Sequence, residues 1–112
     1  MDFKKLKRIF EKQNLSLTRE KDGKYWIYRV EGWTTMGQNI VFETSVRKFS
    51  EFINEFKSHT ENYDCSSEAY IWLDSTGHGK NGAPYDMHDV YTDMEEVKNC
   101  FESVVNDMEA TK

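Results

Sequence analysis

The stretch EKDGKYWIYRV, residues 20–30, constrains the fold more than any other part of the sequence. Asp22-Gly23 favours the tight type I′ turn of a β-hairpin, because such dipeptides tolerate the positive φ angles that this turn needs. Leu15 and Leu17 alternate with polar residues before the turn, and YWIYRV after it is rich in strand-forming residues. The sequence therefore predicts two antiparallel strands joined at Asp22-Gly23.

Residues 1–60 are expected to complete an α-β-β-β-α order around this hairpin. Asp2 is the predicted N-cap of a first helix that ends near Asn14, and NIVFET, residues 39–44, predicts a third strand. Ser45 is expected to cap a second helix through SVRKFSEFINEFKSH. Both helices carry apolar stripes at helical spacing: Phe3, Leu6, Ile9 and Phe10 in the first, and Val46, Phe49, Phe52, Ile53 and Phe56 in the second.

Residues 61–112 are expected to form a helical extension packed on that unit. SEAYIWLDS, residues 67–75, favours a short helix over a strand, and apolar residues three or four apart predict a long helix from Met87 to near Met108. A chain of 112 residues is close to the commonest domain size. We therefore expect one α+β domain, a three-stranded antiparallel sheet in α-β-β-β-α order followed by a short helix and a long C-terminal amphipathic helix.

The connection before the long helix, STGHGKNGAPYD at residues 75–86, resembles several ligand loops without matching any. A P-loop needs Ser or Thr where Asn81 follows Gly79-Lys80, and a calcium loop needs Glu where Tyr85 stands. The GxGxxG spacing of its glycines lacks the βαβ context of a dinucleotide site. One set of candidate metal ligands matches no standard zinc spacing: Asp74, His78, Asp86 and His88. The stretch is interpreted as a connector that orients the helix after it, and no metal or cofactor is expected.

Charge divides the chain into two unlike parts. Residues 1–60 carry 12 Lys and Arg against 8 Asp and Glu, whereas residues 61–112 carry 3 against 12. The first part is therefore net positive and the second strongly negative. Such a division is compatible with a solvated acidic face or with an acidic surface for a basic partner.

The acidic side chains of the long helix are expected to form one ridge. Asp86, Asp89, Asp93 and Glu96 follow one another at intervals of three or four residues, and only Lys98 follows before the C-terminus. An uncompensated ridge of carboxylates suits an arginine-lined groove, where it would take the place of phosphates. Tyr85 and Tyr91 are expected to add contact area.

A second interpretation is a nucleic-acid-binding module. The first helix is basic, and basic residues alternate with aromatic ones in the hairpin. On the second strand, Trp26 and Tyr28 share one face while Tyr25 and Arg29 share the other, and either face could stack bases. The residues that would contact nucleic acid are Lys4, Lys5, Arg8, Lys24, Trp26, Tyr28 and Arg29.

Enzymatic and membrane functions have less support in the sequence. A small enzyme or metal protein built around His78 and His88 is a third interpretation, but no catalytic signature accompanies them. The mean hydropathy of −0.82 argues against a membrane span, and the basic start lacks the apolar region of a signal peptide. Cys65 and Cys100 stand apart, which favours two reduced thiols in a cytoplasmic protein, although a disulfide is possible.

Two resemblances follow from these patterns. The layout of MDFKKLKRIF, EKDGKYWIYRV, NIVFET and SVRKFSEFINEFK resembles the element order of double-stranded-RNA-binding domains, which implies RNA binding. The small size, the sheet and the acidic DMHDVYTDMEEVKNCFESVVNDME are similar to small anti-CRISPR and antirestriction proteins of phages and mobile elements. That second resemblance implies a non-enzymatic inhibitor that covers the basic nucleic-acid groove of a host nuclease, and it is the expected function.

Overall fold

The computed structural model describes residues 1–76 and 87–111, and it confirms the expected α+β class and element order. The three strands form one antiparallel sheet in the order β1-β2-β3. The elements are α1 (Phe3–Lys12), β1 (Ser16–Asp22), β2 (Tyr25–Trp33), β3 (Asn39–Val46), α2 (Phe49–Glu61), α3 (Cys65–Thr76) and α4 (Met87–Ala110).

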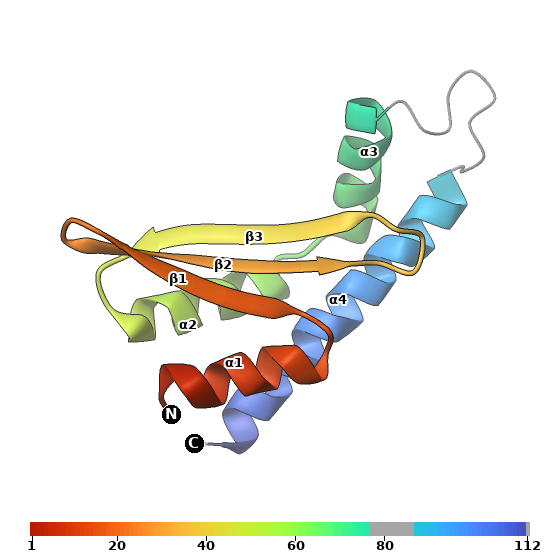
Figure 1. Cartoon of the computed structure of the whole chain (residues 1–112). Coiled ribbons are helices and arrows are strands. Elements are labelled where there is room, and N and C mark those ends of the chain that lie inside the picture. Colours follow the sequence, from red (N-terminus) through yellow and green to blue (C-terminus); the bar gives the residue numbers. More distant parts are fainter. Residues whose placement is uncertain (77–86, 112) are drawn as a thin grey trace.

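Two helices, α1 and α2, cover one face of the sheet (Figure 1). α1 and α2 lie beneath that face, α4 runs past them at one end of the sheet and packs against α1, α2 and α3, and α3 rises at the same end. Side chains alternate across the strands, so Leu17, Tyr28 and Val30 point into the core. On the opposite face Trp33 keeps 68% of its surface exposed and Val41 44%.

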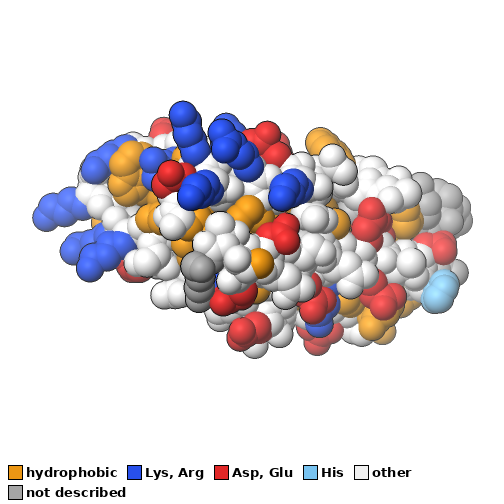
Figure 2. Space-filling model, turned by 90° about the horizontal axis from the view of Figure 1, so that it is seen from below, with side chains coloured by type: hydrophobic (Ala, Val, Ile, Leu, Met, Phe, Trp, Pro, Cys, Tyr) orange, Lys and Arg blue, Asp and Glu red, His pale blue; other side chains and the backbone are white. Residues whose placement is uncertain are grey.

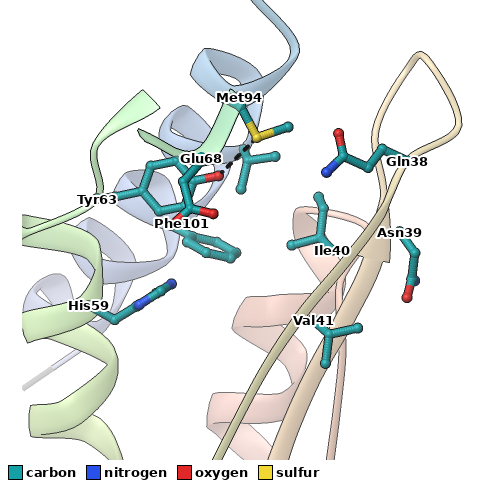
Figure 3. Close-up of a pocket in the computed structure, with 10 residues that line it drawn as sticks. Gln38, Asn39, Ile40, Val41, His59, Tyr63, Glu68, Met94 and Phe101 are labelled. Carbon is teal, nitrogen blue, oxygen red and sulfur yellow. Dashed lines mark hydrogen bonds between the residues drawn. The ribbon is translucent and has the colours of Figure 1, made fainter. Parts of the chain in front are cut away.

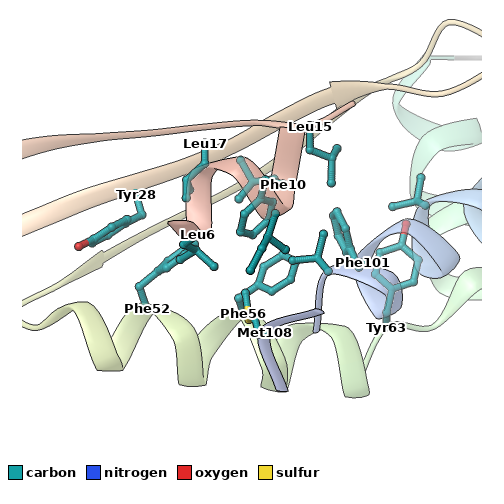
Figure 4. Packing of buried hydrophobic residues seen from close by; sticks show 14 of the residues in the cluster. Leu6, Phe10, Leu15, Leu17, Tyr28, Phe52, Phe56, Tyr63, Phe101 and Met108 are labelled. Atoms are coloured by element: carbon teal, nitrogen blue, oxygen red, sulfur yellow. The ribbon is translucent and has the colours of Figure 1, made fainter. Parts of the chain in front are cut away.

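The core is an aromatic layer between the sheet and the helices (Figure 4). Tyr28 of β2 stacks on Phe52 of α2, with ring centroids 4.4 Å apart. Phe56 meets Phe10 of α1 edge-on at 4.9 Å and Phe101 of α4 at 5.1 Å. These rings join elements that are distant in sequence, so they set how the helices sit under the sheet.

Two local predictions were wrong in detail. Asp22 pairs with Tyr25, so the hairpin loop is Gly23-Lys24, and only Gly23 has a positive φ, of 62°. A positive φ confined to the first loop residue is the pattern of a type II′ turn, rather than the type I′ turn expected at Asp22-Gly23.

The predicted N-cap at Ser45 was also wrong, because β3 continues through Ser45 to Val46, which pairs with Trp26. α2 begins only at Phe49, and the Glu51 carboxylate accepts a hydrogen bond from the Lys48 amide at 3.0 Å. The pairing of β3 with β2 therefore takes two residues that helical spacing had assigned to α2. The N-cap at Asp2 is confirmed, since its carboxylate accepts from the Lys5 amide at 2.9 Å.

Replacing Phe56 by Ala should destabilise the whole domain, because its ring contacts α1, β3, α2 and α4. We expect a loss of about 3–5 kcal/mol in the free energy of unfolding, measured by urea denaturation. Tyr70→Ala is the matched control, since Tyr70 is 60% exposed and should change stability by about 0.5 kcal/mol or less. Equal losses for both variants would contradict the central place given to Phe56.

Candidate functional site

The acidic ridge predicted on α4 does not form an exposed row. Asp93 is buried, with 4% of its surface exposed, and it faces the loop between β2 and β3. Burial raises the pKa of Asp93, while the neighbouring Thr34 side chain and Met36 backbone act to lower it. One carboxylate oxygen, Oδ1, is buried without a hydrogen-bond partner. This side chain is therefore part of the interior and presents no free carboxylate to a partner.

Glu96 is bound to the same loop. Its carboxylate accepts from the Thr35 hydroxyl at 2.8 Å and from the Thr35 amide at 3.3 Å. The loop is closed by its own bonds, in which the Thr34 hydroxyl accepts from the Gln38 amide at 3.0 Å. Asp93 and Glu96 thus lie against the β2–β3 loop, and both have a structural role in holding it on α4.

The structure also places some of the other residues predicted as partner contacts or metal ligands. Asp89 is half-buried, and Tyr91 is half-buried against the hydrophobic core. His88 is exposed near the start of α4. The remaining predicted contacts, Tyr85 and Asp86, lie outside the described residues, as does His78 of the alternative histidine site.

A polar stripe on the outward side of α4 lies outside the predicted ridge. Glu95 and Glu102 are exposed and stand seven residues apart, on the side of the helix away from the core. The apolar stripe runs through Val90, Val97 and Val104, so Asp93, three residues after the first and four before the second, flanks the buried side. Comparing each acidic position with that stripe could have separated Glu95 from Asp93.

This stripe borders a shallow hollow of about 470 Å³ between α4 and the end of α1. Two carboxylates, Glu95 and Glu96, contribute to its wall, and no Lys or Arg does. Amides and hydroxyls supply most of the remaining polar groups, and the lining consists of Gln13, Thr92, Glu95, Glu96, Asn99, Cys100 and Ser103. Carboxylates and hydrogen-bond acceptors without a local cation suit the side chains of a basic surface.

Basic side chains gather elsewhere on the molecule (Figure 2). Lys4, Lys5 and Arg8 of α1 are all exposed, as is Lys24 at the hairpin tip. In the view from below, most Lys and Arg side chains gather along one side and one end, whereas most Asp and Glu side chains are scattered over the remainder. The charge division seen along the sequence is therefore a division in space.

The aromatic residues proposed for base stacking are mostly unsuited to it. Tyr28 is 1% exposed and belongs to the core, which corrects its assignment as a nucleic-acid contact. Trp26 is half-buried beneath the Arg19 guanidinium, 4.8 Å from its ring centroid, with Lys21 at 5.0 Å. Arg29 lies on the opposite face and pairs with Glu31 at 2.9 Å and Glu43 at 3.1 Å.

The cysteines and possible metal ligands give no further site among the described residues. Cys65 and Cys100 are free thiols, and burial raises the pKa of each. In the described part of the chain, no three His, Cys, Asp or Glu side chains come together as a metal site would require. None of the described helices combines the length and apolar character that crossing a membrane requires.

Comparisons with known proteins found no relative of this chain. No family model, no curated protein and no solved structure matches this chain.

Replacing Asp93 by Asn should stabilise the protein near neutral pH, because it removes a buried charge with an unpartnered oxygen. We expect a gain of about 1 kcal/mol in the free energy of unfolding. A carboxyl whose pKa is raised by folding contributes stability below its unfolded pKa, and this contribution is lost as pH rises through the folded pKa. The gain of Asp93→Asn should therefore shrink as the pH is lowered.

Urea denaturation of both proteins from neutral to mildly acidic pH measures this difference. Glu95→Gln is the control, because Glu95 is exposed on the same helix. An Asp93→Asn variant that is less stable than the parent at every pH would show that the charged form is needed by the β2–β3 loop.

Proposed function

We propose that this protein is a non-enzymatic binding module that presents the acidic outer side of α4 to a basic protein surface. The observation that carries the proposal is the hollow beside α4, which has two carboxylates in its wall and no cation. Glu95 and Glu102 extend the negative charge along the exposed side of the helix. Lys57 and Lys98 line a second hollow with Glu102. The hollow lined by Glu95 and Glu96 has no Lys or Arg in its wall, and carboxylates of this kind steer and orient a positively charged partner.

The most specific form of the proposal is an inhibitor that occupies the nucleic-acid groove of a nuclease, in the manner of phage and mobile-element proteins. A nucleic-acid groove is lined by Lys and Arg at phosphate spacing, so a helix edged with carboxylates can compete for it. Exposed Glu95 and Glu102, together with the hollow, would carry these contacts in place of buried Asp93.

Charge reversal tests the proposal directly. A partner captured with the tagged protein and identified by mass spectrometry should lose affinity about tenfold or more for Glu95→Lys/Glu102→Lys, because attraction becomes repulsion. The binding should also compete with the partner's own nucleic acid. Glu20→Lys is the matched control, since Glu20 is exposed on β1 away from the helix. Unchanged affinity in the double variant, or no competition, would contradict the proposal.

Nucleic-acid binding is the second candidate, favoured by the exposed basic residues of α1 and the hairpin. If it is correct, duplex RNA or DNA should shift in a gel, and the affinity should fall steeply with salt. Lys5→Glu/Arg8→Glu should weaken the shift about tenfold and reduce the salt slope by roughly two phosphate contacts. Lys57→Glu is the control. Lys57 already pairs with Glu109, so its replacement should change the affinity for nucleic acid little. A shift that is insensitive to salt would exclude this function.

A further inference from the structure

A cavity of about 140 Å³ lies where the start of β3 meets α2, α3 and α4 (Figure 3). Gln38 and Ile40 line it from the sheet side, and His59, Tyr63 and Phe101 from the helix side. It is separate from the hollow beside α4 and shares no lining residue with it. Neither of the functions considered above uses it.

The cavity carries an unbalanced negative charge. Glu68 is the one acidic side chain among its lining residues, and no Lys or Arg is present there. In Figure 3 the Glu68 carboxylate lies among Tyr63, Met94 and Phe101 beside the open space. Burial lowers the pKa of His59, while the charge of Glu68 acts to raise it.

One wall of the cavity is aromatic. The His59 ring lies 5.8 Å from Tyr63 and 5.8 Å from Phe101, and the Tyr63 and Phe101 rings are 6.0 Å apart. The Tyr63 ring is nearly perpendicular to the His59 and Phe101 rings, so the three form a compact aromatic cluster at one side of the space. The faces of aromatic rings attract cations through their quadrupole.

One acceptor at the cavity is buried and unsatisfied. Gln38 Oε1 is buried without a hydrogen-bond partner, and the Glu68 carboxylate can only accept when it is ionised. The Tyr63 hydroxyl is already used, since it donates to Met94 Sδ at 3.4 Å. The Asn39 side-chain amide donates to the Gly32 carbonyl at 3.0 Å. A ligand with positive charge would complement the Glu68 carboxylate and the unpartnered Gln38 Oε1.

We propose that this cavity binds a small quaternary ammonium ion, with the cation between the Glu68 carboxylate and the aromatic wall and with Gln38 Oε1 as a further negatively polarised contact. The volume suits a group of about six or seven non-hydrogen atoms, because a cavity of about 150 Å³ accommodates benzene. The quaternary ammonium group belongs either to a free small molecule or to a trimethylated lysine side chain. This inference is independent of the basic partner proposed for α4.

Two other occupants make different predictions. A metal ion would need three or more strong ligands, and no such group exists among the described residues. Ordered water would fill the space with about four or five molecules and would satisfy Gln38 Oε1 equally well. Water, however, gives the cavity no preference for a charged solute over a neutral one of the same shape.

Choline and its neutral isostere 3,3-dimethyl-1-butanol test this preference in the unmodified protein. We expect choline to move the NMR signals of the Met94 and Ile40 methyl groups saturably, and the isostere to bind about tenfold more weakly. Glu68→Gln should weaken choline binding about tenfold and leave the isostere unaffected. Glu95→Gln is the matched control, because Glu95 is exposed on α4 outside this cavity.

Equal binding of choline and the isostere, or no saturable shift with choline up to about 50 mM, would overturn the proposal, whatever Glu68→Gln does to stability. Nα-acetyl-trimethyllysine methylamide distinguishes the two sources of the ammonium group. Tighter binding of this compound than of choline assigns the site to a protein side chain, and weaker binding assigns it to a free small molecule. In either case charge reversal on α4 should leave the affinity unchanged, so failure here is distinct from failure of the proposed function.

Discussion

The ring of Phe56 contacts elements that are far apart in the sequence. It meets Phe10 of α1, Phe42 of β3 and Phe101 of α4, each edge-on and within 6 Å. Aromatic pairs in this geometry add about 0.5–1.5 kcal/mol each beyond the burial of their surface. The contact with Phe101 fixes the rotation of α4 about its own axis, and that rotation decides which acidic side chains reach solvent.

The rotation of α4 divides its carboxylates between two roles. Asp93 and Glu96 lie against the loop between β2 and β3, where Thr34 and Thr35 provide hydroxyls and amides. Glu95 lies on the outer side, one residue before Glu96. Neighbouring acidic residues therefore serve different purposes, because 100° of helical rotation separates a donor-rich loop from open solvent.

The arrangement of charge follows from the same packing. α1 lies under the sheet with its lysines outward, and α4 runs past α1 with its exposed glutamates on another side (Figures 1 and 2). Opposite charges on distinct faces make the molecule electrostatically asymmetric, an arrangement that orients proteins relative to charged surfaces. The cavity proposed to bind ammonium lies at the end of the sheet near α3. The basic side chains of α1, the acidic side of α4 and this cavity are therefore built around the same core.

Local spacing in the sequence was sufficient for the fold class, the element order and the approximate bounds of α1 and α4, because helical and strand periodicities are properties of neighbouring residues. It could not decide whether Tyr28 or Arg29 of β2 faces the core, since both faces of that strand carry aromatic residues. Local spacing could not show that β3 extends through Ser45, because that depends on pairing with β2. It also could not show that Asp93 is buried against the loop between β2 and β3. Each of these outcomes depends on what packs against the element from elsewhere in the chain. The sequence by itself determined which elements form, whereas only the tertiary structure decided which of their faces are buried, because burial requires a partner surface that local periodicity does not specify.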